Sequence, residues 1–416
     1  MSEAGRVEAR GLTGRAIRAG TTLAVLTVVE NAVLLVRTLV LSRLLSPFEF
    51  GLMGIAFMSI TLADVLSQTG FARALVQRRD DPEPYMDTVW SVSALRGLLL
   101  AVAVSLSAPA FGAFFRAPAA VPVVQAISLG LLINGLSSPR LALLERELRL
   151  GRHGLPRTAG MVVDLVVTTS LAFAWRSVWA MLAGYLSYCL VMTLTSYLVA
   201  PHRPRPRIDW ERARSLYGFG KHVFRYELTS YLVEQVDRLS VGRLLDVPRL
   251  GLYTFAARMA VLPSTITYTI LLKVAFPAFS RIQQEPERVR EAFHRVLTII
   301  VLTSCFIMAA LASTAPVLIS VLFGETWLPM TTAFRILCLV GGSYAIGQIC
   351  GVVLAGIGRP AVTARAPVIR LVTAGALVVP ATLGWGIEGA AFAAAAGMTA
   401  AAAYLFLSAS RIILLS

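Results

Sequence analysis

Charged side chains are scarce in this sequence. Asp, Glu, Lys and Arg make up 15% of its 416 residues, whereas a soluble domain carries about 25%. Hydrophobic residues make up 56%, and the mean hydropathy is +0.72. A soluble core of this length cannot hide so much apolar surface. The composition therefore excludes a soluble globular protein and predicts a polytopic membrane protein.

Cysteine and histidine are also rare, with four residues of each. The cysteines fall inside apolar runs, which is typical of small buried hydrophobes and does not indicate a disulfide framework. No two histidines have metal-ligand spacing on one helix. The sequence therefore predicts neither a metal site nor a cofactor.

Acidic residues are outnumbered, and the formal net charge is +15. In a soluble protein this excess would favour nucleic acid as a partner. In a membrane protein it favours loops that face anionic lipid head groups. We therefore expect membrane lipids and no nucleic acid among its partners.

Long apolar runs are abundant, and a membrane helix needs about 20 such residues. The runs are continuous rather than alternating, which favours helices over a β-barrel. We expect the ninth run to break at Pro316. The predicted spans are 17–41, 50–72, 88–112, 120–143, 158–175, 177–199, 217–243, 250–275, 293–323, 328–356, 361–384 and 387–410.

Basic residues between these spans are distributed unevenly. With the N-terminus inside, the inside segments together with the adjoining span ends hold 26 Lys and Arg residues, and the outside ones hold 5. Cytoplasmic loops carry such an excess. The count predicts that both termini are cytoplasmic and that the number of spans is even.

Two stretches half a chain apart are similar. VLSRLLSPFEFGLMGIA at 40–56 and SVGRLLDVPRLGLYTFA at 240–256 share Arg, Leu, Leu, Gly, Leu and Ala at an offset of 200. An even number of predicted spans separates them, so both halves would point the same way. The alternative is that two hairpins share a convenient turn.

The favoured interpretation is an all-α protein with about twelve transmembrane helices in two pseudo-symmetric six-helix bundles. The bundles would span 1–200 and 201–416, joined by a Pro- and Arg-rich cytoplasmic linker at about 200–216. An axis along the membrane normal would relate them. This symmetry is typical of bundles that rock about a central site and give alternating access.

Several motifs resemble one family. R43LLSPFEFGLMGIAF57, V236DRLSVGRLLDVPRLGLYTFAARMAVLP263, F323GETWLPMTTAFRILCL339 and L354AGIGRPAV362 are similar to the polysaccharide-transporter branch of the multidrug, oligosaccharidyl-lipid and polysaccharide (MOP) exporter superfamily. The resemblance extends over most of the chain from residue 15 to residue 410.

The resemblance implies a lipid-linked oligosaccharide flippase with a MATE-like fold in the bacterial cytoplasmic membrane. Its substrate would be an undecaprenyl-pyrophosphate glycan for cell-surface polysaccharide, and other polysaccharide-assembly proteins such as a glycan polymerase would be partners. The family needs no ATP, and no Walker motif is present. Many relatives have fourteen helices, so a lipid-tail groove is not assured in this shorter chain.

Several charged residues fall inside the predicted spans, where each ionised group costs roughly 2.5–3.5 kcal/mol on insertion scales. They are expected to face a bundle interior or a watery cavity. A pyrophosphate favours Arg, which binds it in a bidentate way, and Lys as a point charge. The predicted substrate-binding residues are Arg37, Arg225, Arg258, Lys273 and Arg238. For Arg225 and Lys273 the alternative is snorkelling to head groups.

Acidic residues in the spans are candidates for coupling transport to H+ or Na+, because a membrane carboxylate can change protonation as access alternates. Asp64 is the strongest candidate, since it is predicted at mid-span with no basic residue within a turn. The predicted ion-coupling residues are Asp64, Glu30, Glu234 and Asp237.

Spacing also predicts pairs. Glu234 and Arg238 stand at i,i+4, an order that favours an ion pair, and this would leave Asp237 free. The 200-residue offset places Arg37 opposite Asp237, which predicts a latch between the halves. Structural pairing is expected for two other cations, Arg96 and Arg335.

Other classes of function are alternatives to a flippase. A multidrug exporter is the nearest alternative, although the surplus of cations in the spans disfavours cationic drugs. A glycosyltransferase or polymerase would need large outside loops with catalytic carboxylates, and these loops are short. The sequence therefore predicts a transporter and not an enzyme. A cavity free of charges would favour a third alternative, a lipid scramblase or structural membrane protein without coupled transport, but the predicted spans do contain charges.

Overall fold

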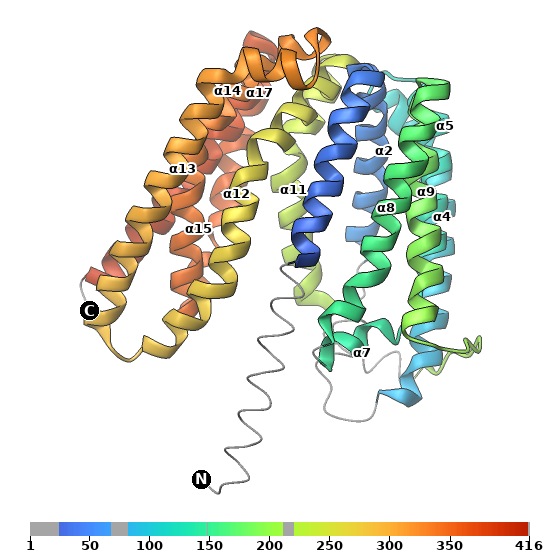
Figure 1. Cartoon of the computed structure of the whole chain (residues 1–416), viewed down its shortest axis with the longest axis horizontal. Helices are drawn as coiled ribbons and strands as arrows, with labels where there is room; N and C mark the ends of the chain where they lie inside the picture. Colours follow the sequence, from blue (N-terminus) through green and yellow to red (C-terminus); the bar gives the residue numbers. More distant parts are fainter. Residues whose placement is uncertain (1–24, 68–81, 148, 211–219, 415–416) are drawn as a thin grey trace, which may run out of the picture. The chain divides into compact units, whose positions relative to one another are not determined.

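In the computed structural model, residues 25–67, 82–147, 149–210 and 220–414 are described, and their regular secondary structure is entirely helical (Figure 1). Contacts divide the chain into two units. The N-terminal unit contains Met1–Leu45 and Ile55–Leu228, and the C-terminal unit contains Ser46–Gly54 and Thr229–Ser416. The division passes through the second helix, so the first turns of that helix pack with the C-terminal unit.

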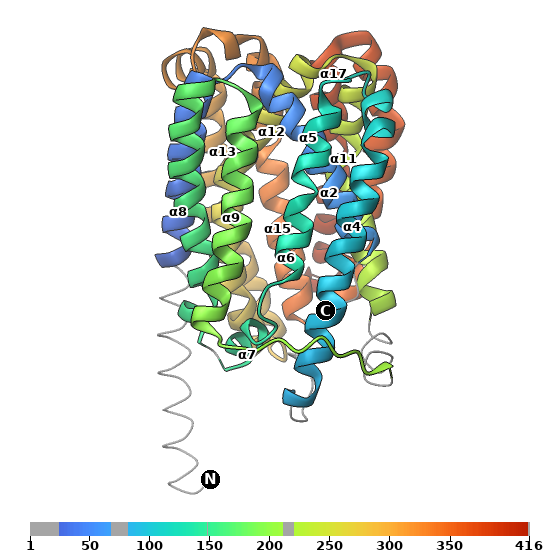
Figure 2. The same cartoon turned by 90° about the vertical axis from the view of Figure 1, so that its right-hand side faces the viewer.

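The N-terminal unit is built on a helix at Val25–Leu44 and on long helices that follow it. In this unit α8 packs along α9 over much of its length, and α4 packs on α5 and α6 (Figure 2). The elements, with α2 shared between the units, are α2 (Pro47–Leu66), η1 (Glu83–Tyr85), α4 (Met86–Phe114), α5 (Ala120–Ile127), α6 (Leu129–Gly135), α7 (Leu141–Arg146), α8 (Leu150–Trp175) and α9 (Val178–Val199).

The C-terminal unit packs its helices around α15, which contacts α12, α13 and α17 (Figure 1). Its elements are α11 (Gly220–Leu244), α12 (Val247–Ile282), α13 (Pro286–Leu322), η2 (Glu325–Met330), α14 (Thr331–Leu339), α15 (Gly341–Gly356), α16 (Pro360–Thr363) and α17 (Ala366–Leu414).

Large apolar side chains lie exposed along these helices, as expected where lipid is the solvent. Leu198 of α9 is 79% exposed, and Phe306 of α13 is 77% exposed. In the described residues, eight helices are long and apolar enough to cross a membrane. The chain is therefore a multi-pass membrane protein. The count of twelve spans and the cytoplasmic placement of the termini stay predictions.

Several predicted spans differ from the observed helices. The span predicted at 120–143 is two short helices, α5 and α6, which meet at Ser128. The two last predicted spans both lie in α17, which bends at Gly386 in the left-handed region (φ 64°). A Cβ on Gly397 would lie 2.8 Å from the carbonyl oxygen of Arg370, so the two halves of α17 fold back on each other.

The break expected at Pro316 is wrong, because α13 continues through this residue. Proline has no N–H to donate to the carbonyl four residues earlier. That carbonyl belongs to Ala312, and Arg335 of α14 donates its Nε–H to it at 3.0 Å. The cation therefore replaces the missing donor, which confirms the structural role expected for Arg335.

The two copies of the repeated segment pack against each other in the C-terminal unit. A Cβ on Gly51 would lie 2.1 Å from the carbonyl oxygen of Val247, and one on Gly251 would lie 1.8 Å from that of Pro47. The offset of 200 makes these two contacts equivalent. Such a reciprocal pattern is that of an isologous interface. The two segments therefore make equivalent backbone contacts with each other, which favours a repeat over two unrelated turns.

Both copies also begin their helices with a side-chain cap. The Ser46 backbone N–H donates to the Glu49 carboxylate at 2.9 Å, and the Ser46 hydroxyl contacts the same carboxylate. In the second copy, Asp246 accepts from the backbone N–H of Arg249 at 2.8 Å. Caps of this kind satisfy amides that the first helical turn leaves free. They fix where α2 and α12 start, and so place the two glycines.

We predict that Gly51→Ala and Gly251→Ala each lower the melting temperature of the detergent-purified protein. The added methyl would meet a backbone carbonyl that cannot rotate away, and overpacking of this kind costs ~1–3 kcal/mol. Gly54→Ala is the matched control on the same helix, because its Cβ would lie 3.9 Å from the nearest atom, Thr254 Oγ1. Equal melting temperatures for all three variants would contradict the reciprocal contact.

Candidate functional site

A buried ion pair joins the helix Val25–Leu44 to α8 in the N-terminal unit. Arg37 Nε lies 2.8 Å from Asp164 Oδ2, and the two side chains are 12% and 16% exposed. The hydroxyl of Thr168, one turn further along α8, donates to Asp164 Oδ1 at 2.7 Å. One oxygen of the carboxylate thus faces the Arg37 cation and the other accepts from Thr168, while Arg37 Nε itself makes no hydrogen bond among the described residues.

A glycine on α9 makes room for this pair. A Cβ on Gly184 would lie 1.7 Å from Thr168 Oγ1 and 2.4 Å from Asp164 Oδ1. Any larger residue would displace the carboxylate that holds Arg37. The close approach of α8 and α9 at this point therefore belongs to the site.

A second polar layer lies one heptad earlier on the same two helices. Glu30 Oε2 lies 3.4 Å from Arg157 Nε, and Glu30 Oε1 accepts from the Thr158 hydroxyl at 3.2 Å. Residue numbers rise together from this layer to the Arg37 layer, so the two helices run parallel. Glu30, predicted to couple ions, thus has a cationic partner.

Asp64 lies in the last turn of α2 rather than at its middle, and although no basic residue lies within a turn of it in the sequence, it has a basic partner from another helix. Arg96 of α4 places Nη2 2.6 Å from Asp64 Oδ1. The same guanidinium also donates to the backbone carbonyls of Asp64 and Ser67, both at 3.0 Å. A search within one helical turn could not find this partner, because it comes from another helix. The structural pairing expected for Arg96 is confirmed.

Asp237 of α11 is buried and not free. It accepts a hydrogen bond from the Tyr253 hydroxyl of α12 at 2.6 Å, and Tyr253 is fully buried. The expected ion pair between Glu234 and Arg238 is not formed in the described part of α11, where Glu234 is exposed and Arg238 donates to Gln235 at 3.4 Å. A latch between Arg37 and Asp237 would join the two units and stays a prediction.

The remaining predicted cations belong to α11 and α12. Arg258 is exposed on α12. The side chains of Arg225 and Lys273 lie outside the described residues. The structure thus places Arg37 and Glu30 in one site and leaves the grouping of the five cations a prediction.

Sequence reasoning missed Asp164, Arg157 and Gly184 as site residues. The signal was present in the spacing, since Glu30 and Arg37 are seven apart and so are Arg157 and Asp164, with the charges reversed. Two helices that carry complementary charges at one spacing can form two ion pairs if they pack in parallel. The sequence alone did not show which helices pack together.

The described helices define a class, that of a polytopic membrane protein. A model of the family described as "Polysaccharide biosynthesis protein" matches residues 40–332. The chain belongs to this family.

Relatives support the same assignment. The chain is 26% identical over 333 residues to the lipopolysaccharide biosynthesis protein WzxC of Escherichia coli, covering 80% of this chain and 68% of that protein. It is 26% identical to the teichuronic acid biosynthesis protein TuaB of Bacillus subtilis (71% and 62% covered). It is also 26% identical to the succinoglycan biosynthesis transport protein ExoT of Rhizobium meliloti (81% and 69%). The chain thus spans about two thirds of these relatives.

Solved structures show the fold. The lipid II flippase MurJ in an inward closed conformation matches with a TM-score of 0.74 at 14% identity, covering 93% of this chain and 87% of that one. An inward-facing multidrug resistance MATE family transporter of the MOP superfamily matches with a TM-score of 0.66 at 17% identity, covering 93% and 95%. The MATE-like fold predicted from the sequence is confirmed.

We predict that Arg37→Met and Asp164→Leu each destabilise the protein strongly, whereas the double variant is far less affected. Each single change strands a buried charge, which costs about 3–5 kcal/mol, and the double change removes both charges. A double-mutant cycle on unfolding free energies in detergent measures the coupling. Additive losses would show that the two side chains do not depend on each other.

Proposed function

We propose that this protein moves a lipid-linked oligosaccharide, a polyprenyl-pyrophosphate glycan, from the inner to the outer leaflet of a bacterial cytoplasmic membrane. Family membership supports a role in polysaccharide biosynthesis. The names of the relatives refer to lipopolysaccharide, teichuronic acid and succinoglycan, and MurJ, which has the same fold, is a lipid II flippase. The protein is thus a transporter and not an enzyme.

The observation that carries this proposal is the pairing of Arg37 with Asp164. A guanidinium enclosed by helices at 12% exposure is a strong anion site, because a low local dielectric strengthens its attraction. Asp164 occupies it in the described state. An entering pyrophosphate would take the place of the carboxylate, since its oxygens can accept from the guanidinium and it carries more charge.

This exchange gives the ion-coupling residues a role. A carboxylate that loses its cation inside a membrane must gain another, and H+ or Na+ can serve. Asp164 is therefore a coupling group, beside Glu30, Asp64, Glu234 and Asp237. Arg225, Arg238, Arg258 and Lys273 would bind the head group at other stages of the path.

The wider architecture follows from the same proposal. Two six-helix bundles, the first within 1–200 and the second within 201–416, would alternate access, with both termini in the cytoplasm. A glycan polymerase and other assembly proteins would act on the exported substrate.

We predict that Arg37→Gln lowers the rate at which reconstituted protein exposes a polyprenyl-pyrophosphate oligosaccharide to a membrane-impermeant glycan-modifying enzyme. The loss should be roughly tenfold or more, because a hydrogen bond to a charged group contributes about 1.5–3 kcal/mol. Arg295→Gln is the control. That arginine is 72% exposed and pairs with Glu291 on α13 of the C-terminal unit.

The same vesicles test the coupling residues and the alternative. Asp64→Asn should lower only the gradient-driven component of transport if Asp64 couples ions; a purely structural role alongside Arg96 would lower both components.

Because the fold is shared with a multidrug transporter, a fluorescent cationic drug serves as the competing substrate. Drug movement with no exposure of the glycan lipid would overturn the flippase proposal in favour of multidrug export.

A further inference from the structure

A Pro- and Arg-rich segment at residues 201–209, here called the strap, follows α9 and lies across the start of α4. Its prolines remove the amides that a helix would need, and the segment is not helical. Side chains of α4 hold it instead. The backbone N–H of Arg207 donates to Ser91 Oγ at 2.9 Å, and that of Asp209 donates to Thr88 Oγ1 at 3.3 Å. The strap is thus a docked element of the N-terminal unit.

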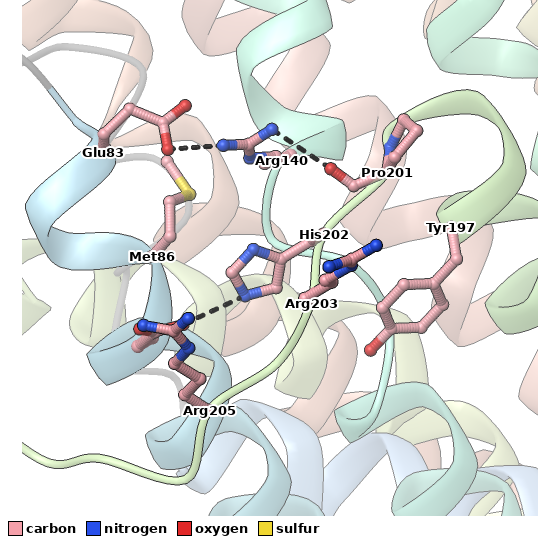
Figure 3. Close-up of a pocket in the computed structure, with 9 residues that line it drawn as sticks. Glu83, Met86, Arg140, Tyr197, Pro201, His202, Arg203 and Arg205 are labelled. Carbon is pink, nitrogen blue, oxygen red and sulfur yellow. Dashed lines mark hydrogen bonds and ion pairs between the residues drawn. The ribbon is translucent and has the colours of Figure 1, made fainter.

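The strap closes one side of a cavity of about 490 Å³. The other walls are the start of α4 with η1, the end of α9, and Arg140 just before α7. Figure 3 shows the imidazole of His202 within the cavity, with the side chains of Arg203 and Arg205 on either side of it. Three guanidinium groups and two carboxylates line this space.

Both carboxylates already have partners within the cavity. Glu83 Oε2 lies 2.6 Å from Arg140 Nη2, and Asp87 Oδ1 lies 3.4 Å from His202 Nε2. Arg203 and Arg205 have no acidic partner in the described part of the chain. Burial lowers the pKa of His202, and the carboxylate of Asp87 only partly opposes this shift. The histidine is therefore neutral at pH 7, and the uncompensated charge comes from arginine.

Two buried nitrogens in the cavity lack hydrogen bonds. Arg140 Nε and His202 Nε2 are enclosed and make no hydrogen bond among the described residues, since the 3.4 Å contact of His202 Nε2 with Asp87 Oδ1 does not have hydrogen-bond geometry. The His202 side chain is 7% exposed. Buried donors of this kind are normally satisfied by protein or ligand. A ligand with several acceptor oxygens fits this set of groups, and a cation does not.

We propose that this cavity binds a phosphate group, separately from the intramembrane site around Arg37. Guanidinium groups match the tetrahedral oxygens of phosphate in a bidentate way. Arg203 and Arg205 are held by a proline-rich strap, which reduces the entropy lost when they bind. Arg207 is the next arginine at the same two-residue spacing, but its side chain does not line the cavity.

A phosphate could come from a lipid head group or from a soluble ester. Trp210 follows the strap and is 77% exposed. Tryptophan is enriched where a membrane meets water, and cations there attract anionic lipids. The exposed Trp210 therefore favours a lipid head group as the source of the phosphate.

The test uses the full-length protein in a neutral detergent and follows its melting temperature with three probes. Dihexanoyl phosphatidylglycerol carries the phosphate on a lipid, dihexanoylglycerol lacks the phosphate, and sn-glycerol 3-phosphate lacks the lipid. At saturation we expect the first probe to raise the melting temperature by roughly 5 °C and the second to have no specific effect. A similar rise with the third probe would assign the site to a soluble phosphate ester.

The variants separate this site from general charge attraction. Arg203→Gln with Arg205→Gln should abolish the rise, and Arg207→Gln, the matched control on the same strap, should keep it. All variants should melt at the wild-type temperature without a probe, since these arginines are exposed. The proposal is overturned if neither phosphate probe stabilises the protein, or if Arg207→Gln loses as much of the rise as the double variant.

Discussion

An ionised side chain inside a lipid bilayer needs a partner, and this constraint organises the N-terminal unit. Arg37 meets Asp164, Asp64 meets Arg96, and Glu30 meets Arg157. Each pair joins two different helices. The ion pairs therefore help to hold particular helices together, and the proposed exchange of anions at Arg37 would use one of these pairs. Helix packing and the proposed transport chemistry depend on the same contacts.

The reciprocal contact in the C-terminal unit shows a second constraint, which is close approach of backbones. Gly51 meets the carbonyl of residue 247, and Gly251 meets that of residue 47. Membrane helices associate through small residues, because lipid supplies no hydrophobic drive between them. The repeat was conspicuous in the sequence because these packing positions tolerate few residues. The contact between the repeated segments depends on steric fit, whereas the intramembrane site depends on electrostatic attraction.

The fold class could be predicted from the sequence because apolar runs report directly on burial in lipid. The limits came from interactions between distant residues. Nothing near Asp64 indicates Arg96 on another helix, and nothing near residue 37 indicates Asp164. Pro316 predicted a break that did not occur, because Arg335 supplies the donor that proline lacks. The sequence showed which residues are charged or can break a helix, but the distant partners of these residues became known only from the tertiary structure.

The central claim is that this protein carries a lipid-linked glycan between leaflets. The most direct measurement is to deplete it in its own bacterium and determine the leaflet that holds the lipid-linked oligosaccharide, using an impermeant glycan-cleaving enzyme on intact and permeabilised spheroplasts. We expect the intermediate to accumulate where only permeabilised cells expose it, and wild-type protein to reverse this. An unchanged distribution between leaflets after depletion would contradict the account.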